Sequence, residues 1–281
     1  MSLVKMSALL DKIEDNSYAV GSFNVSNMEM VMGAIKAAED LHSPIILQIS
    51  EGRLPYSPLA LLGPIMVAGA KKAAVPVAVH LDHGVTMETI QLALDLGFTS
   101  VMFDGSKRTV EENIAMTKVV KKMAAVYDAD IEAEIGRIGG SEGTYSADEL
   151  ITTVEEAKYF ADATGTDALA VAIGTVHGHY REKPDLHIER LREIASVVSC
   201  PLVLHGGSGI SDADFRRCIR GGIRKINIAT SSYDAVARHI YDQAQEDRHA
   251  SYFDFSAAAA KGTYENVKRH MLVFGTENKV K

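Results

Sequence analysis

The sequence predicts an α/β protein, a single-domain (β/α)₈ TIM barrel, and three observations favour this fold class. Short β-rich runs alternate with longer amphipathic runs along all 281 residues, and turn residues separate them. Several β-rich runs, such as ALAVAIG, PLVLHG and PIILQIS, are almost continuously apolar, which is typical of parallel strands covered on both faces. Eight strand–helix units in alternation favour a closed barrel over an open sheet.

The predicted elements follow one another in a regular order. We predict strands over residues 18–25, 44–50, 75–83, 100–105, 130–136, 168–174, 201–206 and 225–230. We predict helices over residues 28–41, 58–73, 86–96, 110–127, 154–163, 186–197, 212–220, 233–246 and 257–274. An open doubly wound sheet is the rival fold, but FNVSNM follows the first strand in place of a glycine-rich turn. No linker or shift in composition divides the chain, so we expect residues 1–281 to form one domain.

The composition argues against several classes of protein. The formal net charge of −8 disfavours a general nucleic-acid-binding protein, because affinity for a phosphate backbone needs a basic face. The apolar stretch 59–70 is interrupted by Gly63 and Pro64 and is too short to span a membrane. We recognise no signal peptide, and Cys200 and Cys218 are too few for a disulfide framework. We therefore expect a cytoplasmic protein that binds neither nucleic acid nor membrane.

Three histidines stand where predicted strands end, which is where barrels of this kind place their reacting groups. His83, His177 and His205 follow three different strands. Imidazole suits a borderline cation such as Zn²⁺, and three protein ligands with one open position form the arrangement of catalytic zinc sites. A lone histidine is more often a hydrogen-bonded core or surface residue. Three of them at equivalent strand ends make a metal site a serious alternative.

The other histidines are weaker candidates for metal ligands. His179 lies two residues past His177, so spacing alone does not choose between them. His80 falls inside the third predicted strand, where a packed histidine is expected. The remaining histidines fall in predicted helices or linkers and are expected to be solvated: His42, His187, His239, His249 and His270.

Two segments at the ends of adjacent strands predict a phosphate site. The segment HGGSG, from His205 to Gly209, leads from the seventh strand into a helix that starts near Asp212. Its glycines let backbone N–H groups approach an anion, and a helix N-terminus favours negative charge. The segment NIAT, from Asn227 to Thr230, supplies side-chain donors and further N–H groups. Plain turns use the same residues, but loops after the last two strands frequently bind phosphate in barrels.

Carboxylates also gather at these strand ends and in the glycine-rich stretch 138–150. They are Asp82, Asp104, Glu134 and Glu142. Such groups can be solvated or paired with Arg137 and Lys225. Near a dication they orient ligand imidazoles or transfer protons. The sequence alone leaves these roles open.

Eight segments in order along nearly the whole chain together resemble one family. They are FNV, PIILQIS, HLDHG, VMFDGS, EAEIGRIGG, AVAIGTVHGHY, LVLHGGSGI and KINIAT. The sequence resembles the class II, metal-dependent ketose-bisphosphate aldolases, the family of fructose- and tagatose-bisphosphate aldolases. The resemblance implies a (β/α)₈ barrel with one Zn²⁺ per subunit and a monovalent cation, Na⁺ or K⁺, near the phosphate. It further implies a small phosphorylated sugar as substrate and a homodimer or homotetramer as the assembly.

The resemblance implies a role for each matching residue. The three histidines at strand ends match the zinc ligands. Asp82 matches the acid that exchanges a proton with the aldehyde-derived oxygen, and Glu142 matches the acid implied in proton transfer at the ketose phosphate carbon. Asp104 and Glu134 match carboxylates that support the metal ligands or the substrate. The residues that match substrate and phosphate contacts are Asn24, Ser50, Gly178, Gly206, Gly207, Ser208, Asn227, Ala229 and Thr230.

Two departures from the family pattern bear on the sugar rather than on the reaction. Ala229 stands where one branch has an aspartate, so this segment looks more like the tagatose-type branch. Ser141 stands where some relatives carry a second acid, which leaves Glu142 alone.

The expected reaction is reversible retro-aldol cleavage of a ketose 1,6-bisphosphate into dihydroxyacetone phosphate and glyceraldehyde 3-phosphate. A metal ion would stabilise the developing enediolate as a Lewis acid, so no lysine Schiff base is required. Lys225, the candidate for such a lysine, begins its predicted strand and is expected to lie away from the barrel mouth.

Other functions compete with this one. A related aldolase would act on another phosphorylated ketose or keto-acid, such as 6-phospho-5-dehydro-2-deoxygluconate from inositol breakdown. A zinc hydrolase on the same barrel and a non-catalytic subunit are remoter alternatives. The sequence leaves open the sugar configuration and whether the aldehyde half is phosphorylated. A basic contact for a second phosphate could come from a neighbouring subunit or from Arg53, Arg181 or Lys183.

Overall fold

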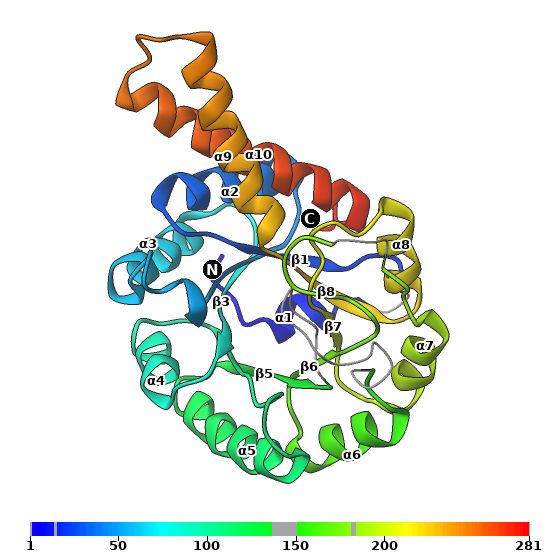
Figure 1. Ribbon diagram of the computed structural model, residues 1–281. Coiled ribbons are helices and arrows are strands. Elements are labelled where there is room, and N and C mark those ends of the chain that lie inside the picture. Colours follow the sequence, from blue (N-terminus) through cyan, green and yellow to red (C-terminus); the bar gives the residue numbers. More distant parts are fainter. Residues whose placement is uncertain (1, 14–15, 137–150, 181–183, 281) are drawn as a thin grey trace.

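Eight parallel strands form the centre of the molecule (Figure 1). The computed structural model describes residues 2–13, 16–136, 151–180 and 184–280. The strands are β1 (Val20–Asn24), β2 (Ile45–Ser50), β3 (Val77–Gly84), β4 (Ser100–Phe103), β5 (Asp130–Ile135), β6 (Ala168–Val171), β7 (Leu202–Leu204) and β8 (Ile223–Ile228). They pair in sequence order, and β1 pairs with both β2 and β8. The predicted (β/α)₈ barrel is therefore confirmed.

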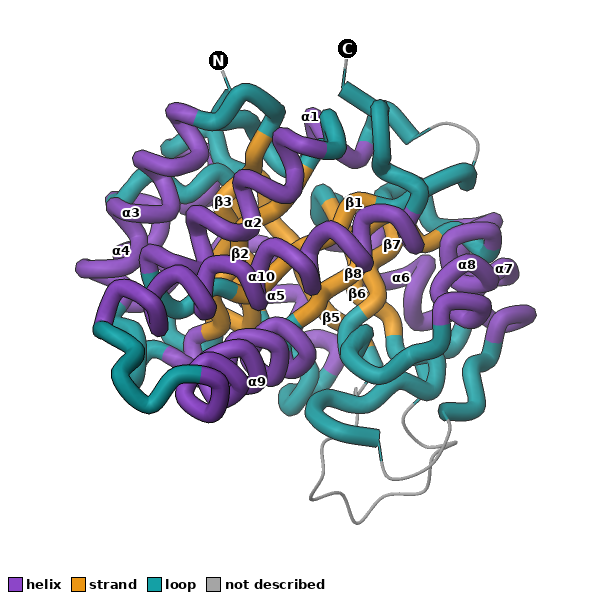
Figure 2. The backbone as a smooth tube through the Cα atoms, turned by 90° about the horizontal axis from the view of Figure 1, so that it is seen from above, coloured by secondary structure: helices purple, strands orange, loops and turns teal. Residues whose placement is uncertain are grey.

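Helices form a ring around the strands (Figures 1 and 2). They are α2 (Met28–Asp40), α3 (Leu59–Lys72), α4 (Met87–Asp95), α5 (Val110–Val126), α6 (Val154–Thr164), α7 (Ile188–Val197), α8 (Asp212–Arg220), α9 (Thr230–Glu246) and α10 (Tyr252–Phe274). A 3₁₀ turn, η1 (Glu51–Arg53), follows β2. Capping boxes fix the starts of α5 and α6, where Thr109 pairs with Glu112 and Thr153 with Glu156. Among the described helices, none is long and apolar enough to cross a membrane.

A short helix that the sequence did not predict closes the N-terminal end of the barrel. This helix, α1 (Ser7–Leu10), places Leu9 and Leu10 in an apolar cluster with Ile46, Ala78 and Val203, which lie early in their strands. The opposite, C-terminal end is where the polar strand-end residues lie. The fold therefore confines the polar site to one mouth.

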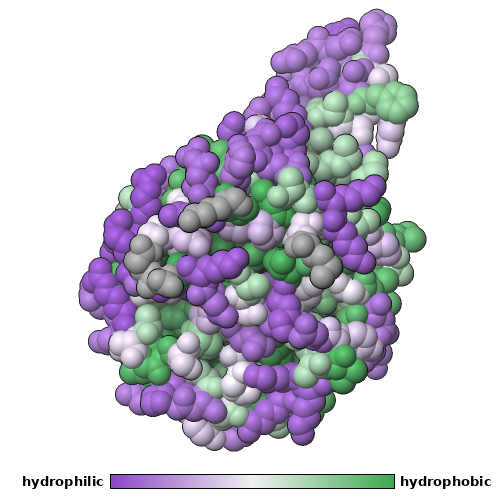
Figure 3. Space-filling view, turned by 180° about the vertical axis from the view of Figure 1, so that it is seen from behind, coloured by the Kyte–Doolittle hydropathy of each residue, from purple (hydrophilic) through white to green (hydrophobic). Residues whose placement is uncertain are grey.

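The end of α9 and the start of α10 form an arm that projects beyond the barrel (Figure 1). α9 begins at Thr230 and α10 at Tyr252, so both start earlier than the predicted residues 233 and 257. The two helices pack on each other, and α10 also packs on α2. Tyr241, Tyr252 and Phe253 are exposed on the arm. In Figure 3 the arm projects from a face on which hydrophilic and hydrophobic side chains are interspersed.

His270 lies in the core, which corrects the expectation that it is solvated. Its side chain is buried in α10 among the rings of Phe23, Phe215 and Phe274, at centroid distances of 6.3, 6.0 and 5.6 Å. Its Nδ1 lies 2.8 Å from the backbone oxygen of Asn266. Burial lowers the pKa of His270 to about 4. The folded protein therefore holds this imidazole neutral.

Replacing His270 with leucine is expected to remove one source of acid sensitivity. Because the pKa of His270 is about 4 in the fold and about 6.5 when unfolded, the unfolded chain binds more protons between these values. Its contribution to stability is complete above pH 6.5 and declines as the pH falls toward 4. From pH 7.5 to 4.5, wild type should lose about 2–3 kcal/mol more unfolding free energy than His270→Leu. Urea unfolding at both pH values measures this, and equal losses would contradict it.

Candidate active site

Three histidines meet at the C-terminal mouth of the barrel. His83 is the penultimate residue of β3, His177 lies in the loop after β6, and His205 directly follows β7. One ring nitrogen of each lies within 4.8 Å of those of the other two. The backbone at His83 is left-handed, with φ at +47°, where the pairing of β3 with β4 shifts register. Strain of this kind in a non-glycine residue persists only where its surroundings impose it, and it concentrates at functional sites.

Carboxylates hold the outer ring nitrogens of two of these histidines. His83 Nδ1 lies 2.8 Å from Asp104 Oδ2, and His205 Nε2 lies 2.8 Å from Glu132 Oε1. Because an ionised carboxylate only accepts hydrogen bonds, these ring nitrogens carry the protons and donate them. The opposite nitrogens, His83 Nε2 and His205 Nδ1, face each other at 3.0 Å. When both rings are neutral, these nitrogens present two facing lone pairs, and a cation between the rings would accept both of them.

A buried ion pair lies beneath the histidines. Lys225 Nζ is 2.8 Å from Glu132 Oε2, and neither side chain is exposed to solvent. Burial raises the pKa of Glu132, but Lys225 and His205 outweigh it and hold that pKa well below its usual range. This lysine therefore neutralises one carboxylate only. Among the described residues, no lysine or arginine forms an ion pair with the other acids of the mouth, Asp82, Asp104 and Glu134.

Glu134 is the least compensated of these acids. Its Oε2 is buried without a hydrogen-bond partner in the described structure, 3.5 Å from His205 Nδ1 and 3.9 Å from His83 Nδ1. Burial, together with the nearby charges of Asp104 and Glu132, raises the pKa of Glu134 to about 8. At neutral pH this carboxyl is therefore mostly protonated, and a cation bound beside it would favour its ionised form.

The imidazoles differ in their affinity for protons. Burial lowers the pKa of His177 to about 3 and also lowers that of His205, so both are neutral and can offer a lone pair. Burial also lowers the pKa of His83. The negative charges of Asp82, Asp104 and Glu134 outweigh this effect and raise the pKa to about 10. Three imidazoles, two of them backed by carboxylates, suit a borderline dication such as Zn²⁺. The described residues therefore fit a metal site.

Amide side chains fix the position of Asp82 beside the histidines. Asn227 Nδ2 donates to Asp82 Oδ1 at 3.0 Å, and Gln48 Nε2 donates to Oδ2 at 3.3 Å. Gln48 Nε2 also lies 2.6 Å from Asn24 Oδ1. Burial opposes ionisation of Asp82, but the charges of neighbouring histidines lower its pKa. Asp82 is therefore an ionised carboxylate in a fixed place, which a proton acceptor in catalysis requires.

The two predicted phosphate segments form one wall of the site. Gly206 has φ at +68°, and a Cβ there would lie 2.5 Å from Val176 O, so this position requires glycine. α9 begins at Thr230 without a side-chain cap, and both Ala229 and Thr230 line the cleft. The N–H of the second residue of α9 donates to Ser208 Oγ at 3.1 Å. An uncapped helix start beside glycine-rich backbone is a favourable place for an anion.

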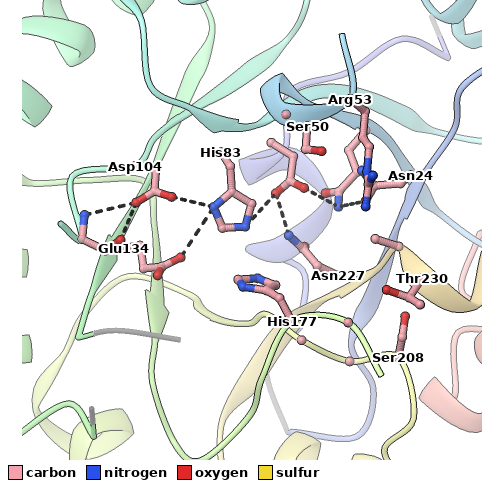
Figure 4. A pocket seen from close by; sticks show the side chains of 18 of the residues that line it. Asn24, Ser50, Arg53, His83, Asp104, Glu134, His177, Ser208, Asn227 and Thr230 are labelled. Carbon is pink, nitrogen blue, oxygen red and sulfur yellow. Dashed lines mark hydrogen bonds and ion pairs between the residues drawn. The ribbon is translucent and has the colours of Figure 1, made fainter. Parts of the chain in front are cut away.

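A cleft of about 530 Å³ brings the predicted residues together (Figure 4). Those that line it are Asn24, Ser50, Asp82, His83, Asp104, Glu134, His177, Gly178, Gly206, Gly207, Ser208, Asn227, Ala229 and Thr230. His205 contacts His83 and is fully buried. Glu142 lies outside the described residues, as do Arg181 and Lys183. The structure thus places in one site those predicted residues that it describes, and the roles of all of them remain predictions.

The weaker histidine candidates lie outside the metal cluster. His80 is buried within the barrel, where its Nδ1 lies 2.8 Å from Ser100 Oγ, as expected of a packed histidine. His179 is exposed, and its Nε2 lies 3.7 Å from Asp234 Oδ2. The structure therefore distinguishes His177 from His179, which spacing did not.

Sequence reasoning missed part of the support beneath the site. Gln48 lies in a run that otherwise reads as apolar, so nothing singled it out. Lys225 was expected to lie away from the mouth, but its Nζ reaches Asn227 Oδ1 at 2.7 Å beneath the cleft. Glu132 shares a face of β5 with Glu134, as alternation along this strand predicts, but its contacts with Lys225 and His205 were not predicted.

Comparisons with known proteins agree with this geometry. The family model for class-II fructose-bisphosphate aldolase matches residues 4–279. A sulfofructosephosphate aldolase from Alkalicoccus urumqiensis is 38% identical over 100% of this chain and 99% of its own length. A fructose-bisphosphate aldolase from Staphylococcus aureus strain Mu50 is also 38% identical, over 100% of both chains. The crystal structure of the YdjI aldolase from Escherichia coli K12 matches with a TM-score of 0.89 and 35% identity, over 99% of this chain and 100% of the other.

Proposed function

The chain belongs to the class II fructose-bisphosphate aldolase family of lyases, and from this we propose that it cleaves a ketose 1,6-bisphosphate reversibly. The products are dihydroxyacetone phosphate and glyceraldehyde 3-phosphate, and the ketose is tagatose- or fructose-bisphosphate. Family members are zinc-dependent in general, and His83, His177 and His205 would hold one Zn²⁺ per subunit. The observation that carries the proposal is the pair of histidine nitrogens 3.0 Å apart, each backed by a carboxylate.

Asp82 would begin the cleavage by accepting the hydroxyl proton at the scissile bond. The carbon–carbon bond then breaks, the aldehyde leaves, and the electron pair stays on the dihydroxyacetone phosphate half. Zinc, when bound, supplies Lewis-acid stabilisation of the negative charge that develops there. Asn227 and Gln48 hold the Asp82 carboxylate in place during the transfer. Glu142 is proposed to return a proton to the carbon.

The wall formed by the loops after β7 and β8 would bind the phosphate of the dihydroxyacetone half. Gly207, Ser208 and the start of α9 line the cleft together, and they offer backbone N–H groups and a hydroxyl. A monovalent cation, Na⁺ or K⁺, is proposed beside this phosphate. We further propose a cytoplasmic homodimer or homotetramer, and size-exclusion chromatography with light scattering tests the assembly.

Replacing Asp82 with alanine is expected to lower kcat about 10²–10⁴-fold, the usual contribution of a positioned proton-transfer group. The zinc content should stay unchanged, because the fitted ligands are the histidines. Condensation of dihydroxyacetone phosphate with glyceraldehyde 3-phosphate measures the first effect, and metal analysis measures the second. Loss of zinc from this variant would assign Asp82 to ligand support instead. Phosphate release from esters by the wild type, without any condensation, would favour the zinc hydrolase.

A further inference from the structure

Arg53 is a cation at the edge of the cleft that has no ion-pair partner among the described residues. It ends η1, and with Thr230 it lines both the main cleft and a second pocket of about 380 Å³. Within the described part of the chain, no carboxylate forms an ion pair with its guanidinium. Asp234 also lines the second pocket, but its Oδ2 lies 3.7 Å from His179. The guanidinium is therefore available to an anionic ligand.

The backbone around Arg53 is fixed. Its carbonyl oxygen accepts hydrogen bonds from Tyr56 N at 3.0 Å and from Ser57 N at 3.1 Å. The nearest acid in the sequence, Glu51, turns away from it. The Glu51 carboxylate accepts from Thr86 N at 3.1 Å and from Thr86 Oγ1 at 2.7 Å, which ties η1 to the start of α4. Glu51 therefore holds the turn and does not neutralise Arg53.

An aromatic ring restricts the side chain of Arg53. Its Cζ lies 5.6 Å from the ring centroid of Tyr233, in the first turn of α9. The ring is itself held, because Tyr233 Oη accepts a hydrogen bond from Ser26 Oγ at 3.1 Å. A guanidinium positioned over a ring keeps N–H donors at its edge free, and their fork matches a carboxylate or a phosphate. Because the Arg53 side chain is preorganised in this way, binding an anion costs less conformational entropy.

Arg53 lies on the side of the cleft that the aldehyde half would occupy. Ser50, at the end of β2, pairs in register with Asp82, which is proposed to serve the hydroxyl of the aldehyde half. Figure 4 shows Arg53 beside Asn24 and Ser50, on the opposite side of His83 from Asp104. A substrate that extends from Asp82 over the end of β2 therefore approaches Arg53.

We propose that Arg53 determines substrate specificity by binding an anionic group, a phosphate or a carboxylate, at the far end of the aldehyde half. This inference rests on the proposed aldolase function. In the condensation, C3 of dihydroxyacetone phosphate loses a proton and bonds to the aldehyde carbon, whose oxygen gains a proton. Arg53 takes no part in these steps and acts through binding. Its identity would thus decide which aldehydes are accepted.

The test compares three aldehydes, each condensed with dihydroxyacetone phosphate by the zinc-loaded enzyme. They are glyceraldehyde 3-phosphate, tartronate semialdehyde, which carries a carboxylate, and neutral glyceraldehyde. In Arg53→Met, kcat/KM for one or both anionic aldehydes should fall about 10–100-fold, the usual value of charge-assisted hydrogen bonds. The value for neutral glyceraldehyde should change less than about 3-fold. The anionic aldehyde whose kcat/KM falls more identifies the anionic group that Arg53 binds. Arg53→Lys should recover part of the lost kcat/KM.

Lys107 offers a matched control, because it is a second cation that lines the cleft and it follows Asp104 closely in the sequence. Lys107→Met should leave the ratio between anionic and neutral aldehydes unchanged. Equal losses for all three aldehydes in Arg53→Met, or a rise confined to the KM for dihydroxyacetone phosphate, would overturn the assignment. So would a loss of selectivity in Lys107→Met alone. Absence of condensation by the wild type would overturn the proposed function itself, and the wild-type assay alone reveals it.

Discussion

Replacing Lys225 with methionine is expected to destabilise the protein by about 3–5 kcal/mol, because it leaves the charge of Glu132 buried without its ammonium partner. The two side chains are fully buried and 2.8 Å apart. Methionine fills a similar length of the barrel interior, so lost packing contributes little. Urea or guanidinium unfolding of wild type and variant measures the difference in unfolding free energy.

The control for Lys225→Met removes the partner charge as well. Glu132→Gln in the same chain neutralises the uncompensated carboxylate, so the double variant should be more stable than Lys225→Met alone. The coupling energy between the two positions should then exceed about 1 kcal/mol. A loss below about 1 kcal/mol for Lys225→Met, or simple additivity of the two changes, would show that the ion pair does not stabilise the fold.

Removal of zinc is expected to lower aldolase activity at least about 10³-fold, since Lewis-acid stabilisation contributes several kcal/mol to the barrier. Returning zinc should restore activity. It should also raise the melting temperature by about 5 °C when free zinc exceeds its dissociation constant about 100-fold, because the ion binds the folded state. The thermal shift is independent of turnover. Full activity after exhaustive chelation would contradict the proposed metal site.

Two variants of neighbouring histidines test which one binds the ion. His177→Ala should abolish both the thermal shift and the activity, because His177 belongs to the three-histidine cluster. His179→Ala should retain both, because His179 is exposed and faces Asp234. The reverse result would identify His179, rather than His177, as the metal ligand. Since the two changes remove the same side chain from one loop, general damage to that loop is controlled.

The sequence predicts the barrel well, because its signals are local. Apolar runs mark strands buried on both faces, and amphipathic runs mark the helices between them. Local patterns also locate the mouth, because the polar residues that line it end or follow their strands. The strand that carries His83 and the strands that precede His177 and His205 were therefore predicted correctly, although only the structure brings the three rings together.

What the sequence could not predict depends on contacts between distant residues. The four residues of α1 are too short for a helical period to appear, and their role comes from packing against inward-facing strand residues. The pairing of Lys225 with Glu132 joins β8 to β5 across the barrel. α9 begins at Thr230, almost directly after the end of β8, and no side chain caps this helix start. Such features emerge only when the barrel closes.

The spacing of the three histidines along the chain has a consequence for assembly during synthesis. His83 lies in the first half of the polypeptide, and its Nε2 lies 3.0 Å from Nδ1 of His205, a residue 122 positions later. Until residue 205 has emerged from the ribosome, the nascent chain lacks the complete set of three histidines. Tight zinc binding should therefore come late in synthesis, after the seventh strand has joined the sheet. It would mark the stage at which the barrel is nearly complete.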